Sequence, residues 1–107
     1  MANIALTPGP HALTVPITML PASQSGQAYV FLTSDSAGST VVATGTTVPF
    51  TSTGASQNVA LPITVPAGGA LYYAFVAVYE NGIAIGAYPQ TNTIAVGQVT
   101  VGQGTWV

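Results

Sequence analysis

Three side chains in this sequence could act as an acid or a base near neutral pH: His11, Asp35 and Glu80. Glycoside hydrolysis needs two carboxylates held roughly 5–10 Å apart. Asp35 and Glu80 both lie in turn sequences, however, where capping of the backbone or contact with solvent is enough to explain them. The residue types of a Ser-His-Asp triad are present, but the chain has no G-x-S-x-G nucleophile elbow. We therefore expect the protein not to be an enzyme.

Metal and cofactor sites are not expected either. Zinc and calcium sites need clustered His, Cys or carboxylate ligands, and this chain has no cysteine, one histidine and two separated acids. No ligand-binding motif accompanies these residues, so we expect no cofactor. A site shared between subunits at a symmetry axis stays open as an alternative.

The charge inventory restricts the partners. Lysine and arginine are absent, the formal net charge is -2 and the mean hydropathy is +0.55. Affinity for nucleic acid and for anionic lipid depends on basic residues, so we expect neither a nucleic-acid nor a membrane partner. Because charge repulsion is weak, the surface must be wetted by Thr, Ser, Gln and Asn or covered by other subunits. This composition favours a particle coat or an extracellular fibre over a cytosolic enzyme.

Export signals are not evident in the sequence. No apolar run reaches the roughly 18 residues of a transmembrane helix. The first residues, MANIALTPGPH, lack the basic region and the long apolar core of a signal peptide. We expect either a trimmed chain or a protein that leaves the cell without the secretory route, as virion proteins do by lysis.

The longest apolar-aromatic run, Leu71 to Tyr88, is predicted to be a β-hairpin. Asn81-Gly82 meets the need of a type I′ turn for positive φ at both central positions. Before the turn, β-branched and aromatic residues dominate both faces of the strand, which indicates a central or covered strand. One face is expected to carry Leu71, Tyr73, Phe75, Ala77 and Tyr79, and the other Tyr72, Ala74, Val76 and Val78.

Further strand candidates recur at intervals of roughly 8–12 residues, with turn residues between them. They are Asn3–Thr7, Leu13–Met19, Ala28–Thr33, Thr40–Ala43, Thr46–Thr51, Val59–Val65 and Thr93–Val101. We expect an all-β fold, a single antiparallel β-sandwich of about seven strands. The predicted parts are an N-terminal strand or arm at 1–10, the sandwich domain at 11–101 and a Gly-rich tail at 102–107.

Proline interrupts three of these strands in the pattern aliphatic-Pro-apolar-Thr. The three prolines are Pro16, Pro49 and Pro62. Since proline cannot donate to a strand ladder, each is predicted to lie in an edge strand, at a bulge or at a strand start.

From about Leu13 to Val96 the order of these signals resembles a fibronectin type III domain, within the broader immunoglobulin-like (Ig-like) sandwiches. The best-matching stretch is NVALPITVPAGGALYYAFVAVYENG, in which an alternating strand, a Pro-Gly loop, an aromatic strand and a turn ending in Gly82 follow one another. The chain departs from the family at the second strand, where Ile17 or Met19 replaces the usual tryptophan, and at the corner tyrosine, where Leu71 stands. The resemblance implies an architecture and no functional residues. Sandwiches of this kind are common on tailed-phage heads and tails.

The aromatic and terminal apolar residues are the candidate interface: Tyr72, Tyr79, Tyr88, Trp106, Ile4 and Leu6. Aromatic residues of this kind serve as core, as interface anchors or as a platform for stacking sugars. Trp106 is expected to dock on a neighbouring subunit or back on its own sandwich.

The leading interpretation is a non-enzymatic structural module, a capsid decoration or tail component on the virion surface. Its partners would be a shell or tail subunit, further copies of itself, or both. One alternative is a carbohydrate-binding or adhesive module on an extracellular surface, with a glycan as ligand. The other is a filament subunit joined by strand exchange, with Asn3–Thr7 or Thr93–Val101 as the donor.

Overall fold

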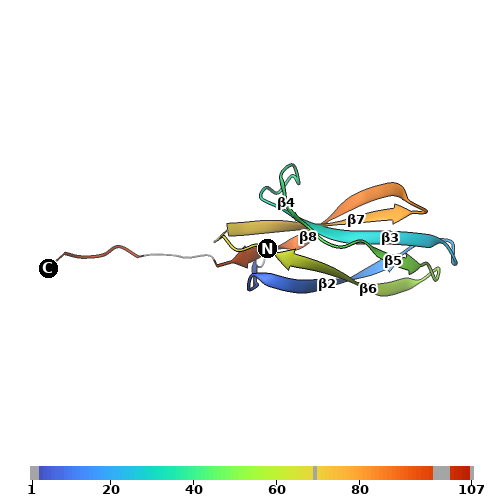
Figure 1. The fold of residues 1–107 in the computed structure, drawn as a ribbon, viewed down its shortest axis with the longest axis horizontal. Helices are drawn as coiled ribbons and strands as arrows, with labels where there is room; N and C mark the ends of the chain where they lie inside the picture. The colour runs from blue at the N-terminus through green and yellow to red at the C-terminus, as the bar shows by residue number, and fades with distance from the viewer. Residues whose placement is uncertain (1–2, 69, 98–101, 107) are drawn as a thin grey trace.

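The computed structural model describes residues 3–68, 70–97 and 102–106 (Figure 1). Within these residues every regular element is a strand, which confirms the all-β prediction. The strands are β1 (Asn3–Ala5), β2 (Gly9–Thr18), β3 (Ser25–Thr33), β4 (Val41–Thr44), β5 (Val48–Thr51), β6 (Ser56–Val65), β7 (Ala70–Glu80) and β8 (Ile83–Val96).

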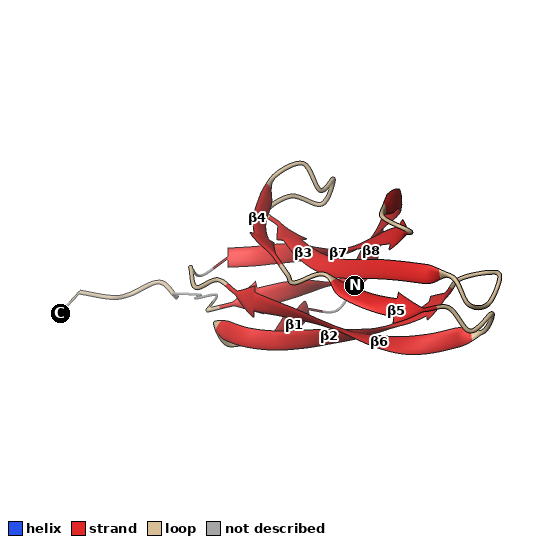
Figure 2. Ribbon diagram, turned by 45° about the vertical axis from the view of Figure 1, so that its right-hand side comes forward, coloured by secondary structure: helices blue, strands red, loops and turns tan. Residues whose placement is uncertain are grey.

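The strands form two layers, a large sheet and a small sheet (Figure 2). The large sheet has the order β1-β8-β7-β3-β4, with β5 also paired to β3, and the small sheet consists of β2 and β6. β1 runs parallel to β8, from Asn3 opposite Thr93 to Ala5 opposite Ala95. The prediction of an antiparallel sandwich was therefore wrong for one pair of strands, and the large sheet is mixed. The described residues form eight strands, where about seven were expected.

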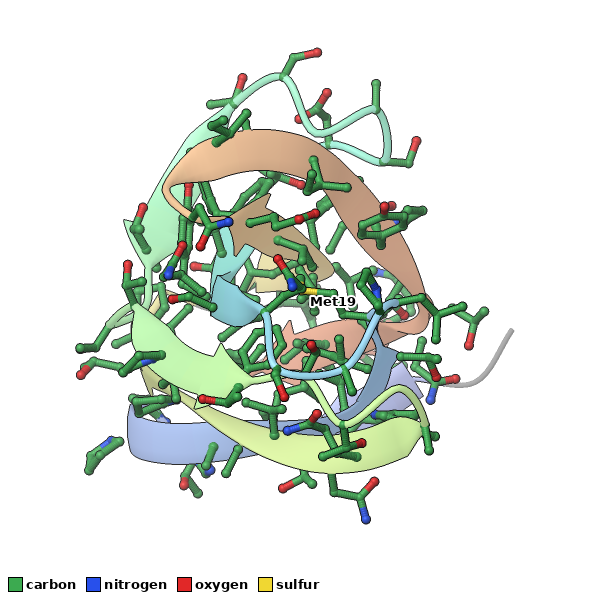
Figure 3. The ribbon with its side chains drawn as sticks, turned by 90° about the vertical axis from the view of Figure 1, so that its right-hand side faces the viewer. Met19 is labelled. Atoms are coloured by element: carbon green, nitrogen blue, oxygen red, sulfur yellow. The ribbon has the colours of Figure 1, made fainter. Side chains whose placement is uncertain are left out.

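The core lies between the two layers and follows the period-two pattern of the sequence. In β6 the alternation predicted for Val59–Val65 is confirmed, and Leu61 is completely buried. In β7 the face that points inward carries Tyr72 and Val76, and Val76 lies opposite Val30 of β3. Seen end on, Met19 points into the space between the layers (Figure 3).

The predicted hairpin is confirmed. Asn81 and Gly82 have φ values of 50° and 80°, and the turn joins Glu80 to Ile83 at the ends of β7 and β8. The Gly82 amide donates to Gln27 Oε1 at 2.9 Å, which ties the turn to β3.

The strand after the turn is longer than predicted. β8 continues from Ile83 to Val96, so the expected separate strands 83–88 and 93–101 are joined into one. The register between β7 and β8 shifts between Tyr73 and Phe75, and Pro89 lies opposite Phe75 next to this shift. The last predicted strand residues, 98–101, lie outside the described residues.

One side of the two-layered body is closed by the chain itself, at the break between β4 and β5. The Gly45 amide donates to Val30 O of the large sheet at 2.8 Å, and the Thr46 amide donates to Pro62 O of the small sheet at 3.2 Å. A Cβ at Gly45 would overlap the Pro62 carbonyl oxygen and lie 2.9 Å from Val30 O. Glycine is therefore required for this close approach, and we call this side the closed side.

The three prolines lie in strands at sheet edges, as predicted. β2 with Pro16 and β6 with Pro62 make up the two-stranded sheet, and β5 with Pro49 pairs only with β3. A strand at an edge tolerates the missing amide because one of its sides has no ladder to complete.

Candidate functional site

The side opposite the closed side is left without a bridging strand over much of its length. β1 pairs with β8 only at Thr93, Ile94 and Ala95. From Ile83 to Gln90, no described strand pairs with the outer edge of β8, and β2 pairs only with β6. Two strand edges, one from each layer, therefore face each other here, and we call this side the open side.

A groove with a volume of about 460 Å³ lies on the open side, and we call it the open-side groove. Its floor is the inner face of β7, and its walls come from β2, the residues just after β2, and β8. The apolar residues that line it are Val15, Ile17, Met19, Leu20, Val76, Val78, Ile85 and Tyr88. Among the described residues that line it, Glu80 is the only charged one.

Large apolar side chains are exposed along the rim of this groove. Leu20 is 68% exposed, and Ile85 and Tyr88 are each 50% exposed. Ile83, next to them on β8, is also exposed. Contiguous exposed apolar surface of this kind marks interaction sites on soluble proteins. The structure therefore places Tyr88, one of the predicted interface residues, at an open apolar groove.

The other predicted interface residues are spread over the molecule. Tyr72 lies in the core with 7% of its surface exposed, so it is not part of an interaction surface. Leu6 packs against the core, and its amide donates to Ala95 O at 3.0 Å, whereas Ile4 on β1 is exposed. Trp106 is fully exposed, in a segment that extends away from the strands (Figure 1).

Tyr79 belongs to a second surface, on the outer face of the large sheet. Its ring stacks on that of Tyr29, with centroids 6.1 Å apart and an interplanar angle of 25°. A hydrogen bond with the Tyr79 side chain, together with partial burial, raises the pKa of Tyr29 above its ordinary value of 10.0. Gln27, Thr47 and Gly82 complete a shallow hollow of about 330 Å³, which we call the tyrosine shelf.

Sequence reasoning missed Leu20, Ile85 and Tyr29 as surface residues. The alternation of Ile83, Ile85 and Ala87 is visible in the sequence, but alternation does not say whether a facing strand covers it. Tyr29 lies within the predicted strand Ala28–Thr33, but the sequence gives no sign that its side chain is on the outer face. These residues could be found only from the sheet order.

The three acid–base candidates of the sequence lie on different elements: His11 on β2, Asp35 in the loop between β3 and β4, and Glu80 at the end of β7. His11 Nε2 donates to Thr7 O at 2.7 Å and so holds the turn between β1 and β2. The Asp35 carboxylate accepts hydrogen bonds from the backbone amides of Thr40 at 3.0 Å and Ser39 at 3.1 Å, which confirms its predicted capping role. These bonds, with that from Thr40 the largest influence, lower the pKa of Asp35 below its ordinary value of 3.8.

Within residues 3–68, 70–97 and 102–106, no group of three or more His, Cys, Asp or Glu side chains could hold a metal ion. In the same part of the chain, no helix is long and apolar enough to span a membrane.

Comparison with known proteins gives no relative. A scan against protein families, a search of curated proteins and a search of solved structures each found no match to this chain.

Proposed function

We propose that this protein is a non-enzymatic structural module that assembles through its surface. The observation that carries the proposal is the open side, where exposed Leu20, Ile85 and Tyr88 surround an apolar groove. A chain with a net charge of -2 and no lysine or arginine has little charge repulsion to keep such a surface free. Covering the groove with another protein surface removes apolar area from water, which favours association by roughly 25 cal/mol for each Å² buried.

The strand order supports a finer assignment of the fold as an Ig-like sandwich. In Ig domains two inner strands, the second and fifth, lie in one sheet, and the third, sixth and seventh lie in the other. β2 and β6 correspond to the first set, and β3, β7 and β8 to the second. β1 and β5 differ from the constant-type arrangement, because both pair with the large sheet. On this assignment the resemblance in sequence favours a virion setting, as a capsid decoration or tail component.

Light scattering on the purified chain across a concentration series tests the assembly proposal. We expect the mass to rise with concentration, to a closed oligomer for a coat component or without limit for a fibre. A monomer at every concentration would contradict self-association. The expected partner would then be a foreign shell subunit, which is tested by measuring binding to assembled shells and to unassembled shell subunits.

A second candidate function, carbohydrate binding, rests on the tyrosine shelf. The stacked rings of Tyr29 and Tyr79 offer an apolar face, and Gln27 and Thr47 offer hydrogen-bonding groups beside it. We expect binding on a broad glycan array that is lost in Tyr79→Ala and kept in Tyr88→Ala, whose side chain lies at the other surface. A flat result across the array would contradict this candidate and leave assembly untouched.

A further inference from the structure

We propose that the open-side groove of one copy binds the Gly102–Trp106 segment of a second copy. The inference rests on the proposed self-assembly and names its two complementary surfaces. It accounts together for an exposed apolar groove and for the only tryptophan of the chain, which is fully exposed.

The positions of the two surfaces favour a partnership between copies. Val96, from which the tail continues, lies opposite Ala70 at the start of β7. The groove lies toward the other end of β7, at Val76, Val78 and Glu80. The tail points away from the strands at the end opposite the turn between β7 and β8 (Figure 1). A tail at one end and a groove toward the other give a head-to-tail contact, which repeats from copy to copy.

The chemistry of the two surfaces is complementary. The tail, Gly-Gln-Gly-Thr-Trp, is uncharged, and the groove presents apolar walls with a single carboxylate. An indole buries a large apolar area but keeps one N–H donor that needs a partner. Glu80 and Gln90 line the groove and supply acceptor oxygens for that donor. Gly102 and Gly104 have no neighbouring atoms within 4 Å of an added Cβ, so the tail is free to approach another backbone.

The edge of β8 offers backbone pairing to the same segment. β1 already occupies this edge at Thr93–Ala95, and the edge continues unoccupied from Gln90 to Ile83 among the described strands. An extended segment placed there would continue the line of β1 and add a strand to the large sheet. A contact this short buries less than the roughly 800 Å² per partner of a standard interface, so we expect association that is reversible and dependent on concentration.

Two substituted full-length chains test the proposal in a mixing experiment. Trp106→Ser disables the tail and leaves the groove, whereas Ile85→Asp places a charge in the groove and leaves the tail. Both positions are exposed, so each chain should keep its fold, to be checked by circular dichroism. Tyr88→Ser replaces Ile85→Asp if the latter fails this check. We expect each variant alone to be monomeric where the native chain associates, and the 1:1 mixture to form heterodimers with blue-shifted tryptophan emission.

The outcomes separate this inference from the proposed function. Oligomers of the native chain that persist in Trp106→Ser would overturn the tail contact and leave self-assembly standing. Native chains that stay monomeric with solvent-exposed tryptophan emission would overturn both. A monomer whose emission is blue-shifted at every concentration would show that the tail binds its own groove, which also overturns the contact between copies.

Discussion

The two sides of this molecule differ in whether the chain itself bridges the large and small sheets. On the closed side, the segment around Gly45 bridges the large and small sheets with one backbone hydrogen bond to each. On the open side, β2 and β8 face each other with no described strand between them from Ile83 to Gln90. The closed side is therefore bridged by backbone hydrogen bonds within the chain, whereas the open side leaves apolar side chains exposed beside strand edges that no described strand pairs with.

This difference distinguishes residues whose contacts stabilise the fold from residues whose exposed side chains could contribute to the proposed association. Substitutions on the closed side should lower the free energy of unfolding, because they disturb backbone contacts that the chain cannot make elsewhere. Substitutions on the open side should change association and leave the free energy of unfolding nearly unchanged.

Between the closed and open sides, Gly45→Ala should have the largest effect. A methyl group there has no room beside the Pro62 and Val30 carbonyl oxygens, so the bridge must shift or break. We expect the free energy of unfolding to fall by about 3 kcal/mol, measured by denaturant titration. Gly102→Ala, at a position with no neighbouring atoms within 4 Å, is the matched control. In dilute monomeric protein it should leave the free energy of unfolding unchanged. Equal losses in the two variants would contradict the close packing of the closed side.

Ser52→Ala should follow with a loss of about 1–3 kcal/mol. The buried Ser52 hydroxyl donates to Pro21 O at 2.7 Å and accepts from the Gln24 amide at 2.8 Å, so it anchors the β2–β3 loop to the end of β5. Alanine leaves both backbone groups without this partner. The prediction is checked by comparing the thermal unfolding midpoint of Ser52→Ala with that of Ser56→Ala, a control at an exposed serine. Similar midpoints in the two variants would refute it.

On the open side, Ile85→Ala should lower the free energy of unfolding by less than about 1 kcal/mol, because half of its side chain is already in water. The same substitution at Ile63, which is buried in the core, should cost about 2–5 kcal/mol. Denaturant titration of dilute monomeric protein compares the two. A cost at Ile85 as large as that at Ile63 would mean that the groove is part of the core.

The smallest effect concerns the β3–β4 loop, which leads to the closed side. Because its folded pKa is lowered, Asp35 contributes stability that is present above its ordinary pKa of 3.8 and is lost as the pH falls through the lowered value. We expect Asp35→Asn to be less stable than the native chain at neutral pH and to differ from it less in strong acid. Unfolding midpoints at both pH values measure this, and a difference that does not change with pH would contradict it.

Local signals in the sequence were enough for most of the elements and much of the core. The Asn81-Gly82 turn, the separation of Thr40–Ala43 from Thr46–Thr51 and the alternation of Val59 to Val65 each reflect a backbone or burial requirement of the residues themselves. The parallel pairing of Asn3–Ala5 with Thr93–Ala95 was not predictable, because it joins segments distant in sequence that carry no matching pattern.

The candidate site was harder to predict than the fold. Both faces of β7 are apolar, so period-two alternation could not show that Tyr72 points into the core and Tyr79 outward. Tyr88 was identified by residue type alone, and its partners Leu20 and Ile85 were missed. A groove between two sheet edges depends on which strands are not neighbours, and no single segment contains that information.

Hydrogen exchange of the native chain at low and high protein concentration tests whether copies associate through the open side. We expect backbone amides on the outer edges of β2 and of β8 between Ile83 and Gln90 to exchange more slowly at high concentration. Amides around Gly45 should exchange at the same rate at both concentrations. Protection that rises with concentration on the closed side, with no change at the open side, would contradict association through the open side.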